Sequence, residues 1–212
     1  MPLPTDPTMV DTIFATLSRR ILQGEVKAGG RLRQEELATE FRASHVPVRE
    51  AFRRLEAEGL VEALPRRGVR VAAMNHARHF EALEMRATLE ALALRHAVSR
   101  FSPGHLVALT VADRACSAAR DVEAWEAANH EFHRLLIAPC QMPQLMQAVA
   151  RLQTAVRWGG RMLGGARHLT LPREDREHRA ILLALQEDDA ERAAAHLTRH
   201  IQRGHLSGQN NR

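Results

Sequence analysis

The chain has 212 residues, enough for one large domain or two small ones, and a formal net charge of +5. No run approaches the roughly 20 apolar residues that span a membrane, and the N-terminus shows no signal-peptide pattern. The two cysteines, Cys116 and Cys140, are too few for a disulfide framework, so we expect a cytoplasmic protein.

The positive charge is local rather than general. Residues 1–75 carry 12 Lys and Arg against 10 Asp and Glu, so this part of the chain is only weakly basic. Six of its eleven arginines nevertheless lie within residues 49–70, at Arg49, Arg53, Arg54, Arg66, Arg67 and Arg70. The local arrangement, and not the overall charge, therefore indicates a polyanionic partner.

Residues 34–61 show the pattern of two short helices joined by a tight turn. An apolar helix over 34–41 comes first. Ser44 is suited to cap the second helix, Pro47 lies in its first turn, and Gly59 ends it. Apolar residues recur at helical spacing along this second helix, and its arginines lie off that stripe. The pattern predicts a helix-turn-helix, whose second helix enters the major groove of DNA.

A predicted β-hairpin follows directly. Two β-prone runs, over residues 60–64 and 69–73, flank the sequence Pro65-Arg66-Arg67-Gly68. Gly68 permits a tight turn, and the two arginines would stand at its tip. A basic-tipped hairpin after a recognition helix is typical of a winged helix-turn-helix.

From residue 76 onward the pattern becomes helical throughout. We predict a domain boundary near Met74 and Asn75, which gives a DNA-binding domain over 1–75 and an all-helical domain over 76–212. The predicted fold class is mainly α: an N-terminal winged helix-turn-helix plus a C-terminal all-α six-helix bundle. The six helices are expected at about 77–100, 104–119, 122–138, 142–161, 172–187 and 189–206.

Four residues of the second domain have the spacing of a metal site. Asn129 and His133 are four apart and share one helix face, while His178 and His200 lie on the last two helices. One oxygen and three imidazoles from three helices would form a compact site with an open coordination position. Spacing alone leaves open that these are surface residues or satisfied core residues.

The N-terminal motifs resemble those of one family. They are Ile21-x-x-Gly24, Glu36-Leu37-Ala38, Ser44-x-x-Pro47-Val48-Arg49-Glu50-Ala51, Leu55-Glu56-x-Glu58-Gly59-Leu60-Val61 and Arg67-Gly68. Over about residues 8–74 the chain is similar to the GntR family of bacterial transcription regulators. Residues 78–206 resemble the FCD effector-binding domain of its FadR-like branch, through Glu84-Met85-Arg86-x-x-Leu89-Glu90, Asn129-x-x-Phe132-His133, Glu177-His178 and Asp189 to His200.

This resemblance implies a metal-dependent effector site. In metal-binding members an Asp and three His hold a divalent ion beneath a small carboxylate effector. The matching residues here are Asn129, His133, His178 and His200, with zinc as the first choice and nickel or manganese as alternatives. Asn129 stands where Asp is usual and brings no negative charge, so either the metal is bound more weakly or the site has lost it.

Arginines in the second domain are candidates for the effector carboxylate. Arg86 interrupts the apolar inner face of the first long helix, and a buried arginine needs a partner. An effector carboxylate would serve, and so would Glu90 at i+4; the resemblance favours the effector. Arg157 and Arg161 are secondary candidates, with solvated side chains as the alternative.

The start of the predicted recognition helix is expected to contact DNA bases. Arg49 is the strongest candidate, because arginine matches the O6 and N7 acceptors of guanine. Its alternative is a salt bridge to Glu50 or Glu56. Ser44 and His45 would meet phosphates or base edges, although His45 departs from the arginine that is usual at this position in the family.

Further basic residues are expected to contact the DNA backbone. Arg53 and Arg54 would follow the phosphates, with one of them solvated as the alternative. Arg66, Arg67 and Gly68 would form the wing, which would reach the minor groove or the flanking phosphates.

We therefore predict a homodimeric transcriptional regulator, a repressor by its resemblance, which binds a palindromic operator and responds to a small carboxylate. One alternative is an architectural DNA-binding dimer without an effector. The least favoured is a metal-dependent hydrolase, because no carboxylate at informative spacing offers a general base. No enzyme activity is expected.

Overall fold

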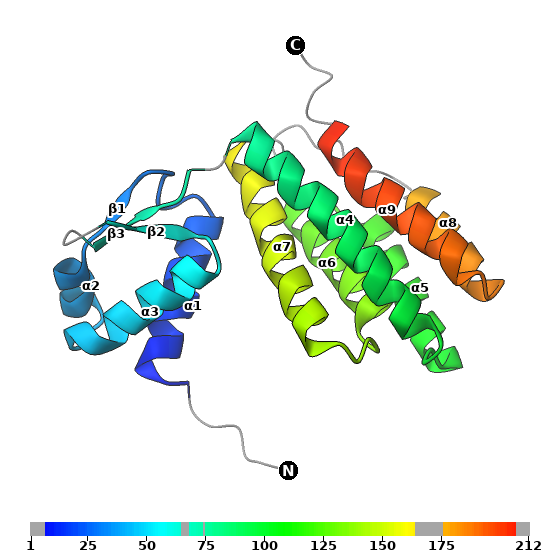
Figure 1. The fold of residues 1–212 in the computed structure, drawn as a ribbon, viewed down its shortest axis with the longest axis horizontal. Helices are drawn as coiled ribbons and strands as arrows, with labels where there is room; N and C mark the ends of the chain where they lie inside the picture. Colours follow the sequence, from blue (N-terminus) through cyan, green and yellow to red (C-terminus); the bar gives the residue numbers. More distant parts are fainter. Residues whose placement is uncertain (1–6, 65–67, 74, 164–175, 207–212) are drawn as a thin grey trace. The chain divides into compact units, whose positions relative to one another are not determined.

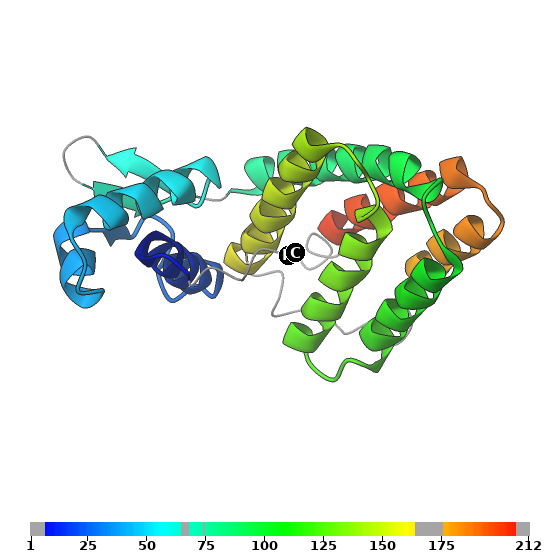
Figure 2. The same ribbon diagram turned by 90° about the horizontal axis from the view of Figure 1, so that it is seen from below.

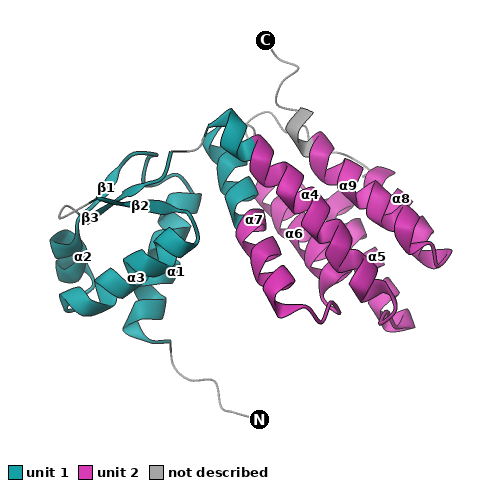
Figure 3. Ribbon diagram, in the orientation of Figure 1, with its two compact units in different colours: residues 1–79, 154–163 teal, residues 80–153, 164–212 magenta. Residues whose placement is uncertain are grey.

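The computed structural model describes residues 7–64, 68–73, 75–163 and 176–206, with side chains as far as Arg203. The chain forms two compact units, one of residues 1–79 and 154–163 and the other of residues 80–153 and 164–212 (Figure 3). Within the described parts, no helix combines the length and apolar character needed to cross a membrane. The domain boundary near residue 75 stays a prediction.

The first unit contains three helices and a small antiparallel sheet (Figure 1). The strands follow the order β1-β3-β2, with Val61 opposite Val71 and Leu64 opposite Gly68. The predicted helices over 34–41 and from Ser44 and the predicted hairpin are all present, whereas α1 and β1 were not predicted. The elements are α1 (Met9–Leu22), β1 (Arg31–Leu32), α2 (Gln34–Glu40), α3 (His45–Ala57), β2 (Val61–Leu64) and β3 (Gly68–Val71).

The ends of α3 follow from its sequence. Ser44 is the N-cap residue, as predicted, but its side chain makes no capping hydrogen bond. Pro47 lies in the first turn, where a missing N–H is tolerated. Gly59 follows the C-cap with a φ of 69°, a conformation that favours glycine. The apolar stripe of α3 is buried against α1, which fixes the exposed side of the helix.

The second unit is helical, as predicted (Figures 1 and 2). Within it, α5 contacts α6 and α8, and α8 pairs with α9. The predicted start of the fifth helix at 172 lies outside the described residues. The six helices of the C-terminal part are α4 (His76–Val98), α5 (Pro103–Ala118), α6 (Val122–Ile137), α7 (Pro143–Met162), α8 (Arg176–Gln186) and α9 (Ala190–Leu206).

Helix α7 contributes to both units. Its residues from Thr154 onward belong to the first unit, where Trp158 is buried in the hydrophobic core together with Ile13, Leu17 and Phe52. Trp158 is therefore a packing residue.

Two glycines with positive φ allow a test of the sheet. A Cβ on Gly68 (φ 84°) would lie 2.6 Å from the carbonyl oxygen of Leu32, whereas a Cβ on Gly59 (φ 69°) would meet nothing within 4 Å. Gly59→Ala should cost about 1–2 kcal/mol of unfolding free energy because of its backbone conformation. Gly68→Ala should cost about 1–3 kcal/mol more, because β1 must move. Urea unfolding measures both, and equal losses would contradict the close contact.

Candidate functional site

Three of the four predicted metal ligands meet inside the second unit. His133 comes from α6, His178 from α8 and His200 from α9. The Nε2 atom of His200 lies 3.3 Å from Nε2 of His178 and 3.2 Å from Nε2 of His133. His133 and His178 are buried and His200 is half-buried, and their ligand atoms all lie within 4.8 Å of one another. This triad could hold a metal ion.

Each imidazole also has a carboxylate at its other nitrogen. Nδ1 of His133 is 2.7 Å from Oε2 of Glu90, and Nδ1 of His200 is 3.0 Å from Oε2 of Glu177. Nδ1 of His178 is 3.4 Å from Oδ1 of Asp113. For His133 and His200 the carboxylate accepts a hydrogen bond from Nδ1–H, which leaves Nε2 as the ligand atom, whereas Asp113 lies close to Nδ1 of His178 without a hydrogen bond.

The sequence analysis did not assign these three carboxylates to the site. Glu90 was considered only as a partner of Arg86, although an acidic residue among apolar neighbours in α4 was a usable signal. Asp113 stands similarly between the buried Leu109, Ala112 and Cys116 of α5. Such carboxylates need an internal partner, but the sequence does not show which one.

The donor set fits a divalent metal ion. A proton on each Nδ1 would leave three Nε2 lone pairs pointing at one another with no proton between them, which is unfavourable unless a cation lies among them. Two nitrogens bound to one ion at roughly 2.0–2.1 Å in tetrahedral geometry would be about 3.3 Å apart. The two Nε2 separations of 3.2 and 3.3 Å match this value.

Asn129 is compatible with a role as the fourth ligand. It lies one turn before His133 on α6. Its Oδ1 atom is buried and accepts no hydrogen bond from any described residue. A buried carbonyl oxygen without a donor is unfavourable, so Asn129 has an oxygen available for an ion.

The rings of the triad are fixed by packing. Phe132 stacks on His178, with ring centroids 3.9 Å apart and planes 18° from parallel. His133 and His200 also stack, with centroids 5.2 Å apart. Stacking and the carboxylate contacts together hold each ring in one orientation before any ligand binds.

Glu90 is the most connected polar group of this region. Its carboxylate accepts from Arg86 Nε at 2.8 Å, from His133 and from Gln153 Nε2 at 2.7 Å. Burial by itself would raise the pKa of Glu90, but the charge of Arg86 and these hydrogen bonds lower it below its usual range. Burial lowers the pKa of His133 to about 3, and the attraction of Glu90 offsets this only in part. The buried His133 is therefore neutral, as a metal ligand must be.

Arg86 forms the internal ion pair that the sequence offered as its alternative role. Its Nε donates to Glu90, four residues further along α4. No described residue accepts a hydrogen bond from its two Nη groups, and its side chain is 13% exposed. The pair with Glu90 therefore leaves part of the guanidinium available.

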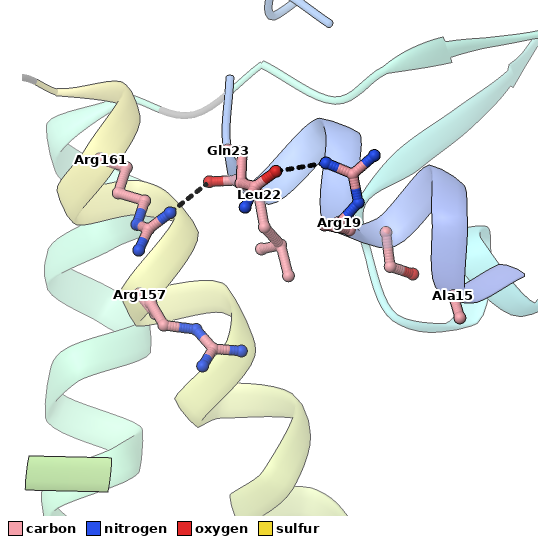
Figure 4. Close-up of a pocket in the computed structure, with 7 residues that line it drawn as sticks. Ala15, Arg19, Leu22, Gln23, Arg157 and Arg161 are labelled. Atoms are coloured by element: carbon pink, nitrogen blue, oxygen red, sulfur yellow. Dashed lines mark hydrogen bonds between the residues drawn. The ribbon is translucent and has the colours of Figure 1, made fainter. Parts of the chain in front are cut away.

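Arg157 and Arg161 are placed in the first unit, apart from the unit that contains the histidines. Together with Ser18, Arg19 and Leu22 of α1, they line a pocket of about 320 Å³ (Figure 4). Arg161 Nη1 lies 3.4 Å from the carbonyl oxygen of Leu22. Their contact with an effector stays a prediction.

The start of α3 is exposed. Ser44, His45 and Arg49 are all exposed, and so is Val46 beside them. Arg49 takes part in no hydrogen bond or ion pair among the described residues. Its alternative partners are engaged elsewhere, because Glu50 pairs with Arg53 and Glu56 accepts from the backbone N–H of Ala63. The Arg49 side chain is therefore available to a ligand outside the unit.

Arg54 is exposed but contacts α1. It contacts Asp11 at 2.6 Å and lies 4.5 Å above the ring of Phe14 in α1, so it joins two helices. Arg53 has only the exposed pair with Glu50. Gly68 begins β3 with a positive φ, as a tight turn requires. The wing residues Arg66 and Arg67 lie outside the described residues, and all of these DNA contacts stay predictions.

Comparison with known proteins identifies the family. Residues 9–71 match the model of the bacterial regulatory proteins of the gntR family. Residues 81–203, more than half of the chain, match the FCD domain.

The chain belongs to the GntR family and carries an FCD domain. It is 30% identical over 204 residues to a protein of Paenarthrobacter nicotinovorans described as a probable D-xylose utilization operon transcriptional repressor, covering 93% of this chain and 87% of that one. It is 27% identical to the transcriptional repressor RspR of Escherichia coli, covering 94% and 88%. Escherichia coli McbR/YncC shares its fold, with a TM-score of 0.74 at 24% identity, covering 92% and 94%.

These relatives are transcription regulators and not enzymes, as predicted for this chain. The GntR regulator therefore combines a DNA-binding winged helix-turn-helix with a helical FCD domain that contains the histidine triad.

The low pKa of His133 predicts a pH-dependent stability. In the folded protein this pKa is about 3, against about 6.5 when unfolded, so the unfolded state binds the extra proton first. The contribution of neutral His133 to the unfolding free energy is complete above about pH 6.5. Below that pH it is lost by about 1.4 kcal/mol for each pH unit. In chelator, unfolding free energies between pH 7 and 5 should fall more steeply for wild type than for His133→Asn. Parallel slopes would contradict the burial of a neutral His133.

Proposed function

We propose that this GntR regulator is a homodimeric repressor whose operator affinity is controlled by a small carboxylate bound over a divalent metal ion in the FCD domain. The main support is the triad of His133, His178 and His200, in which three Nε2 atoms converge while each Nδ1 lies near a carboxylate. The relatives described as repressors support the direction of the response.

The proposed metal ligands are Asn129, His133, His178 and His200. Zinc is the first choice, since it favours nitrogen ligands in a site with one open position. The ion would supply a positive charge and an open coordination position for a carboxylate oxygen. The helices already hold the ring nitrogens in position, so little rearrangement is needed to bind it.

Arg86 is the proposed second contact of the effector. Its Nε is held by Glu90, which in turn holds His133, so the arginine and a metal ligand share one carboxylate. The Nη groups, which bond to no described residue, would bind the carboxylate that also meets the ion. The site thus selects small carboxylates by two positive groups in fixed positions.

The DNA-binding part of the proposal concerns the exposed start of α3. Arg49 would read guanine, Ser44 and His45 would contact phosphates or base edges, and Arg53 would follow the backbone. Arg66, Arg67 and Gly68 would form the wing contact. A single domain offers few base contacts, so we propose a dimer on a palindromic operator. An effector would control operator binding by binding more tightly to one of two states of the dimer, which differ in their affinity for DNA.

Replacing Arg49 should separate recognition from stability. Arg49→Ala should weaken operator binding by about 1–3 kcal/mol and remove discrimination, while weak salt-sensitive DNA binding remains. The unfolding free energy should not change, because Arg49 has no partner among the described residues. Fluorescence anisotropy, with an operator obtained by selection from random DNA, measures this.

Arg114→Ala, an exposed arginine of α5, is the control and should bind the operator as wild type does. Retained discrimination in Arg49→Ala would contradict the assignment of α3 as the reading helix.

Removing two histidines should remove the metal and the response together. Untagged wild-type protein should contain about one metal ion per chain by elemental analysis, and His133→Ala/His178→Ala should contain none. The double variant should still bind the operator, but small carboxylates should no longer release it.

His196→Ala removes a histidine one turn before His200 that lies outside the triad, so it should behave as wild type. A full effector response in the double variant would refute the proposed pocket.

A further inference from the structure

Asn129 leaves the proposed pocket without a negatively charged ligand. The other three ligands are neutral imidazoles, so none of the residues that directly coordinate a divalent ion would carry a negative charge. Three carboxylates stand behind the imidazoles, at Glu90, Asp113 and Glu177. They differ in how far their own charges are already balanced.

Two of these carboxylates have arginine partners. Glu90 pairs with Arg86 at 2.8 Å, and Glu177 pairs with Arg203 at 2.6 Å. The Glu177 side chain is also 28% exposed, so water screens part of its charge. The negative charges of Glu90 and Glu177 are therefore already largely balanced and would contribute little to stabilising a metal ion.

Asp113 is the exception. Its side chain is 16% exposed, and its Oδ1 atom is buried and accepts no hydrogen bond from the described residues. Its ion-pair partner in this part of the chain is the ring of His178, at 3.4 Å, and no described Lys or Arg pairs with it. A mostly buried carboxylate beside an imidazole is unfavourable unless positive charge lies nearby. An ion on the far nitrogen of that imidazole would supply it.

We propose that Asp113 is a positioning residue of the metal site, whose charge replaces the one that Asn129 lacks. This inference rests on the proposed metal pocket. Asp113 lies beside Nδ1 of His178, and its negative charge stabilises the ion through the ring. Partners of metal-bound histidines typically change metal affinity by 10–100-fold.

The test separates the charge of Asp113 from the space that its side chain fills. Asp113→Asn keeps an oxygen acceptor of the same size and removes only the charge, whereas Asp113→Ala removes both. Zinc affinity of the full chain is measured by competition with a chromophoric chelator, for both variants with and without Asn129→Asp. We expect Asp113→Asn to weaken zinc binding by about 10–100-fold, and Asn129→Asp to restore it to within a few-fold of wild type.

The exposed Asp188 provides a matched control. Its φ of 55° suits asparagine equally well, and Asp188→Asn removes one charge from the same unit without touching the triad, so zinc affinity should not change. Thermal unfolding in chelator is a second readout. Asp113→Asn should unfold at the wild-type temperature or above it, since it removes an unbalanced charge, whereas a purely structural role would lower this temperature.

Two outcomes would overturn the inference. One is wild-type zinc affinity in Asp113→Asn; the other is a loss that Asn129→Asp does not restore. If neither wild type nor Asn129→Asp binds zinc, the metal pocket itself is refuted, and the proposed function fails with it.

Discussion

The buried carboxylate of Glu90 is the interaction on which the helical unit depends. A charge without access to water is tolerated only when several donors satisfy it, and here they come from three helices: Arg86 of α4, His133 of α6 and Gln153 of α7. Removing any one of them would leave charge unbalanced or a hydrogen bond unmade. The same network therefore fixes the helix packing, the ring of a proposed metal ligand and the arginine proposed for the effector.

This network also touches the helix that reaches the DNA-binding unit. Gln153 donates to Glu90 in the second unit, and five residues later on α7 Trp158 is buried in the core of the first. That core also includes Val48 and Phe52 of α3, so α7 carries residues of both the Glu90 network and the core behind the proposed reading helix.

Local patterns predicted most of the elements but few of the contacts between them. The helix signals were sufficient for α2 to α9, and the spacing of Asn129, His133, His178 and His200 on three helices suggested a metal site that the resemblance strengthened. Strand β1 could not be found this way, because two residues form a strand only by pairing with β3. The pair of Arg54 with Asp11, 43 residues away, was not predictable from spacing within α3. The carboxylate at each histidine likewise depends on tertiary packing, which no spacing within one helix reveals.

The replacement of a charged inner ligand by Asn129 has a consequence for the effector. A ligand carboxylate and an effector carboxylate both place negative oxygen directly on the ion, so they repel each other and reduce the ion's attraction for the second. A carboxylate behind an imidazole stabilises the same ion from further away and occupies no coordination position. Moving negative charge from position 129 to Asp113 would therefore keep the proposed metal while leaving its open face more positive, which would favour an anionic effector.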